Sequence, residues 1–81
     1  MSKLVGKYID DIFVQESPTG DIDGVNDEFT LSSTPHSAEA VQVFLNGLIQ
    51  NKSTYSISGV TLTFNTAPPS GFDVYCFYIK R

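Results

Sequence analysis

The stretch from residue 40 to residue 64, AVQVFLNGLIQNKSTYSISGVTLTF, predicts two consecutive β-hairpins. In the first hairpin, Asn46 and Gly47 separate two apolar runs, and these residue types best tolerate the positive φ angles of a type I′ turn. A two-residue loop places Leu45 opposite Leu48 and Phe44 opposite Ile49. We therefore expect Phe44 and Ile49 on one face of this hairpin, and the other face to carry Val41, Val43, Leu45 and Leu48.

The second hairpin is predicted from Thr54 to Asn65, with Ser58 and Gly59 as its loop. This loop places Tyr55 opposite Leu62 and Ile57 opposite Val60. The pairing gathers the large apolar side chains on one face, and the other face then carries Thr54, Ser56, Thr61, Thr63 and Asn65. A slip of one residue would reverse both faces, so the sorting specifies the pairing.

Two further strands are predicted outside the hairpins. Residues 28–33 alternate so that Phe29 and Leu31 face inward. The final strand, residues 72–80, is apolar on both faces, with Phe72, Val74, Cys76 and Tyr78 on one and Tyr75, Phe77 and Ile79 on the other. Such a strand either lies between packed layers or is half exposed to a partner, and both alternatives stay open.

Many short strands separated by Gly, Pro and Asn turns predict an all-β fold. We expect a small antiparallel Ig-like sandwich or flattened barrel of about six or seven strands, preceded by an N-terminal arm. The domain organisation is then a docking arm at residues 1–16 and a β-sandwich module at residues 17–81.

The arm has two alternative structures. Leu4, Tyr8 and Ile12 recur every four residues behind Ser2, which predicts a short helix. An extended strand from Tyr8 to Gln15 fits equally well. The arm either completes the core or docks on a neighbouring subunit, and we predict this set of partner-contact residues: Leu4, Tyr8, Ile12, Phe13, Phe44, Ile49, Tyr75, Phe77 and Ile79.

The composition narrows the classes of function. The 81 residues carry a net charge of −4, which argues against nucleic-acid binding as the main role. The sequence lacks an apolar run of about 20 residues, so no membrane span is expected, and Gly6, Lys7 and Asp10 interrupt any secretory signal. One cysteine and one histidine cannot build a structural zinc site, and Cys76 is predicted to be a buried, inert thiol.

No catalytic arrangement of residues is recognisable in the sequence, so we expect neither an enzyme nor a cofactor. The acidic loop Asp21–Glu28 raises the possibility of a bound Ca²⁺. An EF-hand loop needs Gly at its sixth position and Glu at its twelfth, whereas counting from Asp21 gives Gly24 at the fourth and Ser32 at the twelfth. This spacing favours a solvated turn that caps its own backbone.

Four fragments occur here in an order that resembles a small β-module of tailed-phage structural proteins. They are DGVNDEFTLSSTP (residues 23–35), VQVFLNG (41–47), YSISGVTLTF (55–64) and APPSG (67–71), and the resemblance covers residues 23–79. It implies a protein made in the host cytoplasm and located in the virion. The chain has one copy of the module and no fibre shaft, which favours a capsid decoration protein, or a tail or neck adaptor or appendage. The implied partners are a larger virion protein and further copies of the chain, for example in a trimer.

A carbohydrate- or host-surface-binding module is the alternative function. It requires exposed aromatic rings that stack on a ligand, and the candidates are Tyr55, Tyr75 and Tyr78.

Overall fold

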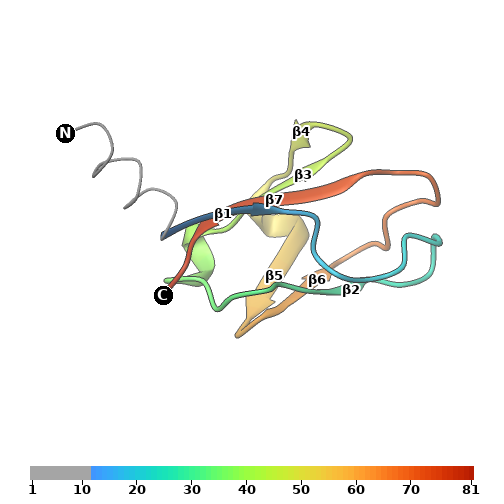
Figure 1. The fold of residues 1–81 in the computed structure, drawn as a ribbon. Coiled ribbons are helices and arrows are strands. Elements are labelled where there is room, and N and C mark those ends of the chain that lie inside the picture. The colour runs from blue at the N-terminus through green and yellow to red at the C-terminus, as the bar shows by residue number, and fades with distance from the viewer. Residues whose placement is uncertain (1–11) are drawn as a thin grey trace.

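The computed structural model describes residues 12–81, and these form two antiparallel β-sheets packed face to face (Figure 1). The first sheet has the strand order β1-β7-β3-β4, and the second has the order β2-β6-β5. Within the described residues the seven strands are β1 (Phe13–Glu16), β2 (Glu28–Thr30), β3 (Gln42–Leu45), β4 (Leu48–Ile49), β5 (Tyr55–Ser58), β6 (Thr61–Phe64) and β7 (Val74–Ile79). The prediction of a small all-β sandwich is confirmed.

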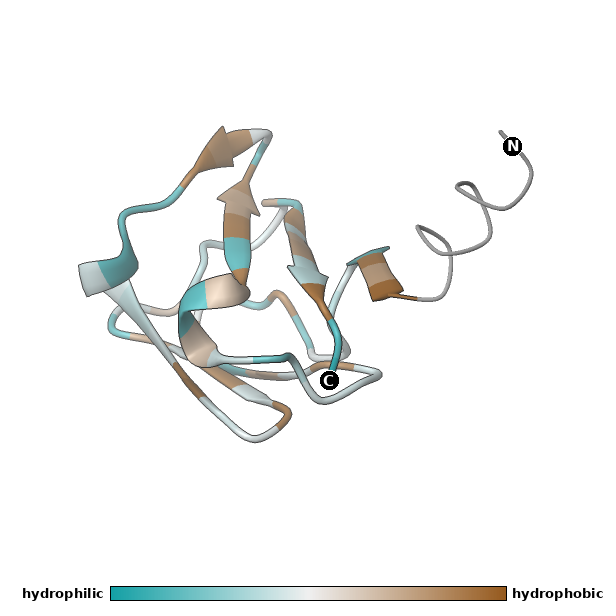
Figure 2. Cartoon of the chain, turned by 90° about the vertical axis from the view of Figure 1, so that its left-hand side faces the viewer, coloured by the Kyte–Doolittle hydropathy of each residue, from teal (hydrophilic) through white to brown (hydrophobic). Residues whose placement is uncertain are grey.

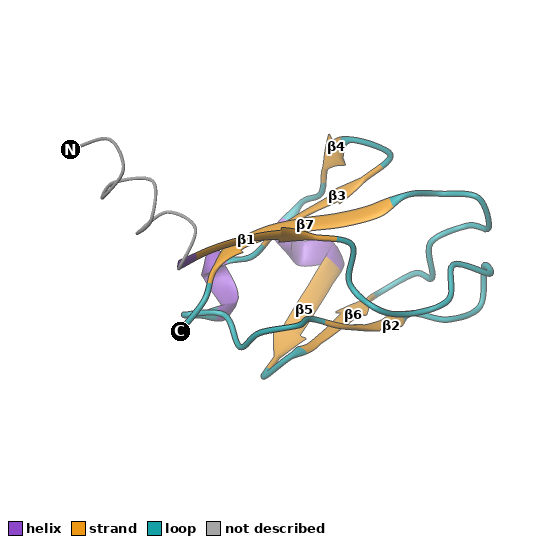
Figure 3. Cartoon of the chain, viewed as in Figure 1, coloured by secondary structure: helices purple, strands orange, loops and turns teal. Residues whose placement is uncertain are grey.

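Two short 3₁₀ helices connect the sheets. One, η1 (Ala38–Ala40), lies between β2 and β3, and the other, η2 (Lys52–Thr54), lies between β4 and β5 (Figure 3). Asn51 caps η2, because its side-chain oxygen accepts a hydrogen bond of 2.9 Å from the backbone N–H of Ser53. Each helix therefore marks a point where the chain crosses from one layer to the other.

The first hairpin forms as predicted. Phe44 pairs with Ile49 and Leu45 with Leu48, and the turn residues Asn46 and Gly47 have φ angles of 52° and 81°. Both values are positive, as a type I′ turn requires. The tip of this hairpin extends beyond the core. Leu48 is therefore 71% exposed, although it was predicted to share a face with the buried Val41 and Val43. Both residues of β4 are hydrophobic (Figure 2).

The predicted register of the second hairpin is wrong by two residues. Tyr55 pairs with Phe64 rather than Leu62, and Ile57 pairs with Leu62 rather than Val60. The loop consists of Gly59 and Val60, and Gly59 has a φ of 60° at the first central position, as in a type II′ turn. A shift of two residues leaves every side chain on its predicted face, so the outward-facing polar set is retained.

The core lies between the sheets and receives side chains from both. Its buried hydrophobic members are Phe29, Leu31, Val41, Val43, Tyr55, Leu62, Phe64, Val74, Cys76 and Tyr78. Cys76 is fully buried, and burial, aided by the negative charge of Glu16, raises the pKa of its thiol to about 12. The prediction of a buried Cys76 is confirmed, and a thiol with this pKa is almost wholly protonated at neutral pH and therefore a poor nucleophile.

Part of the predicted arm belongs to the sandwich. Residues 13–16 adopt the extended alternative and form β1, which pairs with β7 from Phe13↔Ile79 to Glu16↔Cys76. The boundary predicted at residue 16 therefore does not separate this strand from the module. Residues 1–11, including the predicted contact residues Leu4 and Tyr8, lie outside the described residues.

A small polar network ties β1 to the loop that follows β2. The Glu16 carboxylate accepts hydrogen bonds from the Tyr78 hydroxyl (2.6 Å) and the Ser32 backbone N–H (3.0 Å). The Ser33 backbone N–H in turn donates to the Tyr78 hydroxyl oxygen at 3.2 Å. Burial acts to raise the pKa of Glu16, but the hydrogen bonds from Ser32 and Tyr78 outweigh it, and the pKa lies below its usual 4.5. The network favours the charged form of Glu16 in the folded protein.

This lowered pKa predicts a pH-dependent contribution to stability. Because the folded state holds Glu16 below its unfolded pKa, its contribution is fully present above about pH 4.5 and is lost as the pH falls through the folded pKa. The stability lost in Glu16→Gln should therefore be largest at neutral pH and should shrink toward pH 3. Urea unfolding of both proteins across this range measures the difference, and Glu39→Gln, at an exposed site, is the control. A difference that stays constant with pH would contradict the assignment.

Candidate docking surface

The outward face of the first sheet is mainly apolar. Strand pairing places Phe13 beside Ile79, Phe77 between Gln15 and Gln42, and Phe44 between Tyr75 and Ile49. The side chains on this face, which we call the aromatic face, are Phe13, Gln15, Gln42, Phe44, Ile49, Tyr75, Phe77 and Ile79. The aromatic residues are half-buried, while Ile49 and Ile79 are 62% and 39% exposed.

The rings on the aromatic face support one another. Phe13 and Phe77 stack with their centroids 5.4 Å apart and their planes inclined by 22°. Such pairs add about 0.5–1.5 kcal/mol beyond the area they bury. The Tyr75 hydroxyl lies 3.5 Å from Gln15 Oε1, at the limit of a hydrogen bond. The rings therefore form a continuous surface across β1, β7 and β3.

A groove lies at one end of the aromatic face, beside the β3–β4 turn. It has a volume of about 340 Å³ and is lined by Gln15, Phe44, Gly47, Asp73, Tyr75 and Phe77. Gly47 lies at the border of this groove, and a Cβ at that position would meet no atom within 4 Å. We call this feature the Asp73 groove, after its one ionisable carboxylate.

The outward face of the second sheet has the opposite character. The residues that alternate with its buried set are Glu28, Thr30, Ser56, Ser58, Thr61 and Thr63. This face carries small hydroxyl side chains and one carboxylate. The two sheets thus share one core, and of their outward faces only that of the first sheet is apolar among the described residues.

Six of the predicted contact residues come together on the aromatic face: Phe13, Phe44, Ile49, Tyr75, Phe77 and Ile79. Ile12 lies directly before β1, where it is 41% exposed and its backbone oxygen accepts a hydrogen bond of 2.8 Å from the N–H of Lys80. The sequence prediction missed Gln15, Gln42 and Asp73. Each lies two residues from a predicted contact residue: Gln15 from Phe13, Gln42 from Phe44, and Asp73, just before β7, from Tyr75. This period of two was the signal in the sequence that could have identified them.

Two of the three tyrosines proposed as exposed ligand platforms are buried, which corrects that prediction. Tyr55 is 7% exposed and Tyr78 is 1% exposed. The Tyr55 hydroxyl donates to the Val41 oxygen at 2.9 Å, and Lys52 Nζ donates to the same oxygen at 2.6 Å. Both tyrosines thus place their rings in the core and satisfy their hydroxyls within the chain, and only Tyr75 is half-exposed.

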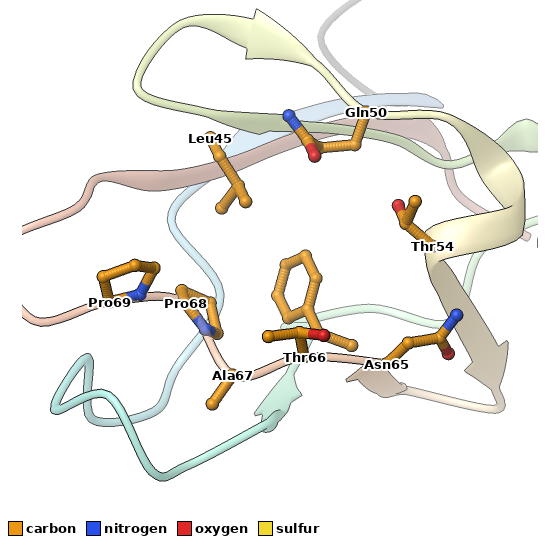
Figure 4. A pocket seen from close by; sticks show the side chains of 9 residues that line it. Leu45, Gln50, Thr54, Asn65, Thr66, Ala67, Pro68 and Pro69 are labelled. Carbon is orange, nitrogen blue, oxygen red and sulfur yellow. The ribbon is translucent and has the colours of Figure 1, made fainter.

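A second cavity lies between the two sheets, next to η2 (Figure 4). It has a volume of about 390 Å³ and is lined by Leu45, Gln50, Thr54, Phe64, Asn65, Thr66, Ala67, Pro68 and Pro69. Its polar side chains mainly serve the chain itself: the Gln50 amide donates to Leu48 O, the Asn65 amide to Ser53 O, and the Thr54 hydroxyl to Asn51 O. These bonds hold the crossing between the layers in place.

The acidic loop caps its own backbone, as the solvated-turn alternative predicts. Asp23 Oδ1 accepts hydrogen bonds of 2.9 Å from the backbone N–H groups of Val25 and Asn26. These bonds lower the pKa of Asp23, the one from Asn26 most strongly. The Asn26 amide donates across the loop to Asp21 O and Glu28 O. From residue 12 to the C-terminus, no group of three or more His, Cys, Asp and Glu side chains is placed to hold a metal ion.

None of the helical segments in the described part of the chain is long and apolar enough to cross a membrane.

Comparison of the chain with protein-family models, with curated proteins and with solved structures gives no match.

Proposed function

We propose that this protein is a non-enzymatic accessory structural subunit of a tailed-phage particle, which docks through its aromatic face onto a larger virion protein. The observation that carries the proposal is the contrast between the two outward faces. Phe13, Phe44, Tyr75 and Phe77 are gathered on one of them, while the other carries serines and threonines. A contiguous apolar patch on a small protein marks an interaction surface.

Docking on this face is favourable for two physical reasons. Apolar surface removed from water contributes roughly 25 cal/mol per Å². In addition, the rings already stack or pair across the sheet, so little side-chain freedom is lost on binding. Aromatic side chains in the centre of an interface commonly dominate the binding energy. We therefore expect Phe77, which is on the inner strand β7 and stacks on Phe13, to be the main anchor.

The type of partner comes from the resemblance of residues 23–79 to phage structural modules. The role we propose within this class is that of a capsid decoration protein or of a tail or neck adaptor or appendage. Homo-oligomerisation, for example in a trimer, is also part of the proposal, and Leu4 and Tyr8 are candidate partner contacts from the N-terminal segment. The carbohydrate-binding alternative has less support, because two of its three tyrosines are in the core.

Purification of the particles tests this proposal. The phage that carries the coding sequence is amplified, the particles are banded on a density gradient, and the protein is quantified by mass spectrometry. We expect it to band with the particles at a fixed copy number. A number that matches the capsid lattice indicates decoration, and one that matches the tail symmetry indicates an adaptor. Recovery of the protein only in particle-free fractions would contradict the proposal.

A further inference from the structure

The Asp73 groove combines aromatic rings with hydrogen-bond acceptors. Phe44, Tyr75 and Phe77 line it together with the Asp73 carboxylate and the Gln15 amide. The turn holds Asp73 in position: its N–H donates to Asn46 Oδ1 at 2.7 Å, and the N–H of Asn46 donates to its oxygen at 2.9 Å. Both bonds use the Asp73 backbone, and the side chain is exposed at the groove.

The cations of the described chain lie elsewhere. Lys80 is seven residues from Asp73 along an extended segment, or roughly 23 Å at the rise of a β-strand, and Arg81 is the next residue. Lys52 donates to Val41 O and lies 5.8 Å from the ring centroid of Tyr55. None of these three cations is placed to neutralise the Asp73 carboxylate, so this carboxylate is available to a cation from outside the described residues.

The chemistry of the groove suits a basic side chain. Arginine and lysine are hydrogen-bond donors without an acceptor, which matches the carboxylate and the amide oxygen. Their charge is attracted to the faces of aromatic rings, and their alkyl stems bury against apolar surface. The net charge of −4 also favours encounter with a positively charged partner surface.

Resting on the proposed function, we propose that the Asp73 groove receives an arginine or lysine side chain of the partner protein, with the cation at the Asp73 carboxylate beside the rings of Tyr75 and Phe44. The groove volume of about 340 Å³ accommodates such a side chain. The space beside Gly47 at the border of the groove is unoccupied, so the turn leaves room for the partner there. The aromatic face then supplies apolar burial, and the groove selects a partner with a basic residue in register.

An NMR titration of the full chain tests the groove with small probes. The probes are N-acetyl-arginine methylamide, N-acetyl-lysine methylamide and the neutral analogue N-acetyl-citrulline methylamide. We expect the two cationic probes to shift the backbone amide signals of Gly47, Asp73 and Tyr75 in a saturable way. Citrulline should bind about fivefold more weakly, the size expected for an exposed charge pair. Equal shifts with citrulline would overturn the proposal.

Two variants remove one negative charge each. Asp73→Asn should weaken the cationic probes about fivefold, whereas Glu39→Gln, at an exposed site in η1, should leave them unchanged. Unchanged binding in Asp73→Asn would also overturn the proposal.

Docking of the same variants on particles tests the groove assignment separately from the proposed function. If Asp73→Asn docks as well as wild type while a change at Phe77 abolishes docking, the groove assignment fails and the docking role stands. If the probes bind as expected but wild type does not dock on particles, the docking role fails and the assignment of a virion partner fails with it, while the selectivity of the groove for a basic side chain stands.

Discussion

Phe77→Lys is expected to weaken attachment to the particle by about a hundredfold while leaving the protein folded. Phe77 lies on β7, one of the two inner strands of the first sheet, faces away from the core and stacks on Phe13. An aromatic anchor in an interface contributes about 2 kcal/mol or more, and the new charge would also have to lose its water on docking. A loss of about 2.7 kcal/mol corresponds to a hundredfold change in affinity.

Thr63→Lys is the matched control for this variant. Thr63 is also half-buried and faces outward, and it lies on β6, the central strand of the second sheet. Its affinity should stay within about twofold of wild type, because this face is not expected to dock. Co-sedimentation with purified particles measures the binding, and thermal unfolding checks that both variants fold. Equal losses in the two variants, or wild-type attachment of Phe77→Lys, would contradict the assignment of the face.

Phe29→Ala is expected to cost about 3–5 kcal/mol of unfolding free energy, the range for removing a buried aromatic ring. Phe29 is 1% exposed, pairs with Leu62 and meets Phe64 edge to face at a centroid distance of 5.7 Å. A domain of this size has only about 5–15 kcal/mol of stability, so the variant should be largely or partly unfolded at 37 °C. Phe29 belongs to the one hydrophobic core between the two sheets, so its loss should affect the whole domain.

Val25→Ala is the control for the core variant. Val25 is 83% exposed in the acidic loop, so its truncation should change stability by no more than about 0.5 kcal/mol. Urea unfolding followed by circular dichroism suits this chain, which contains no tryptophan. A cost below about 1 kcal/mol for Phe29→Ala would show that the ring does not fill the core as described.

The two hairpins show how far the sequence specifies the fold. Asn46-Gly47 admits one turn with positive φ at both positions, so the first pairing is predicted correctly. In the second hairpin, Gly59 serves the first central position of the turn rather than the second. Alternation of apolar and polar residues cannot separate these registers, because a shift of two leaves each side chain on the same face. The turn geometry decided the pairing, and the sequence pattern left it open.

The outward position of Tyr75, Phe77 and Ile79 follows partly from the sequence. Alternation predicts two apolar faces on the last strand, but the number of sheets covering it depends on the tertiary arrangement. In the structure β7 lies between β1 and β3, and the second sheet covers the face with Val74, Cys76 and Tyr78 (Figure 1). Alternation places Tyr78 on the same face as the buried Cys76, but its hydrogen-bond partner Glu16 was not predictable, since it is 62 residues away in the chain.

Hydroxyl-radical footprinting of the protein on intact particles asks directly whether the aromatic face is covered there. Oxidation of individual side chains is compared between free and particle-bound protein by mass spectrometry. We predict that Phe44, Tyr75 and Phe77 are protected on the particle, while Val25, exposed in the acidic loop, is oxidised equally in both states. Equal oxidation of Tyr75 and Phe77 in the free and bound protein would contradict docking through this face.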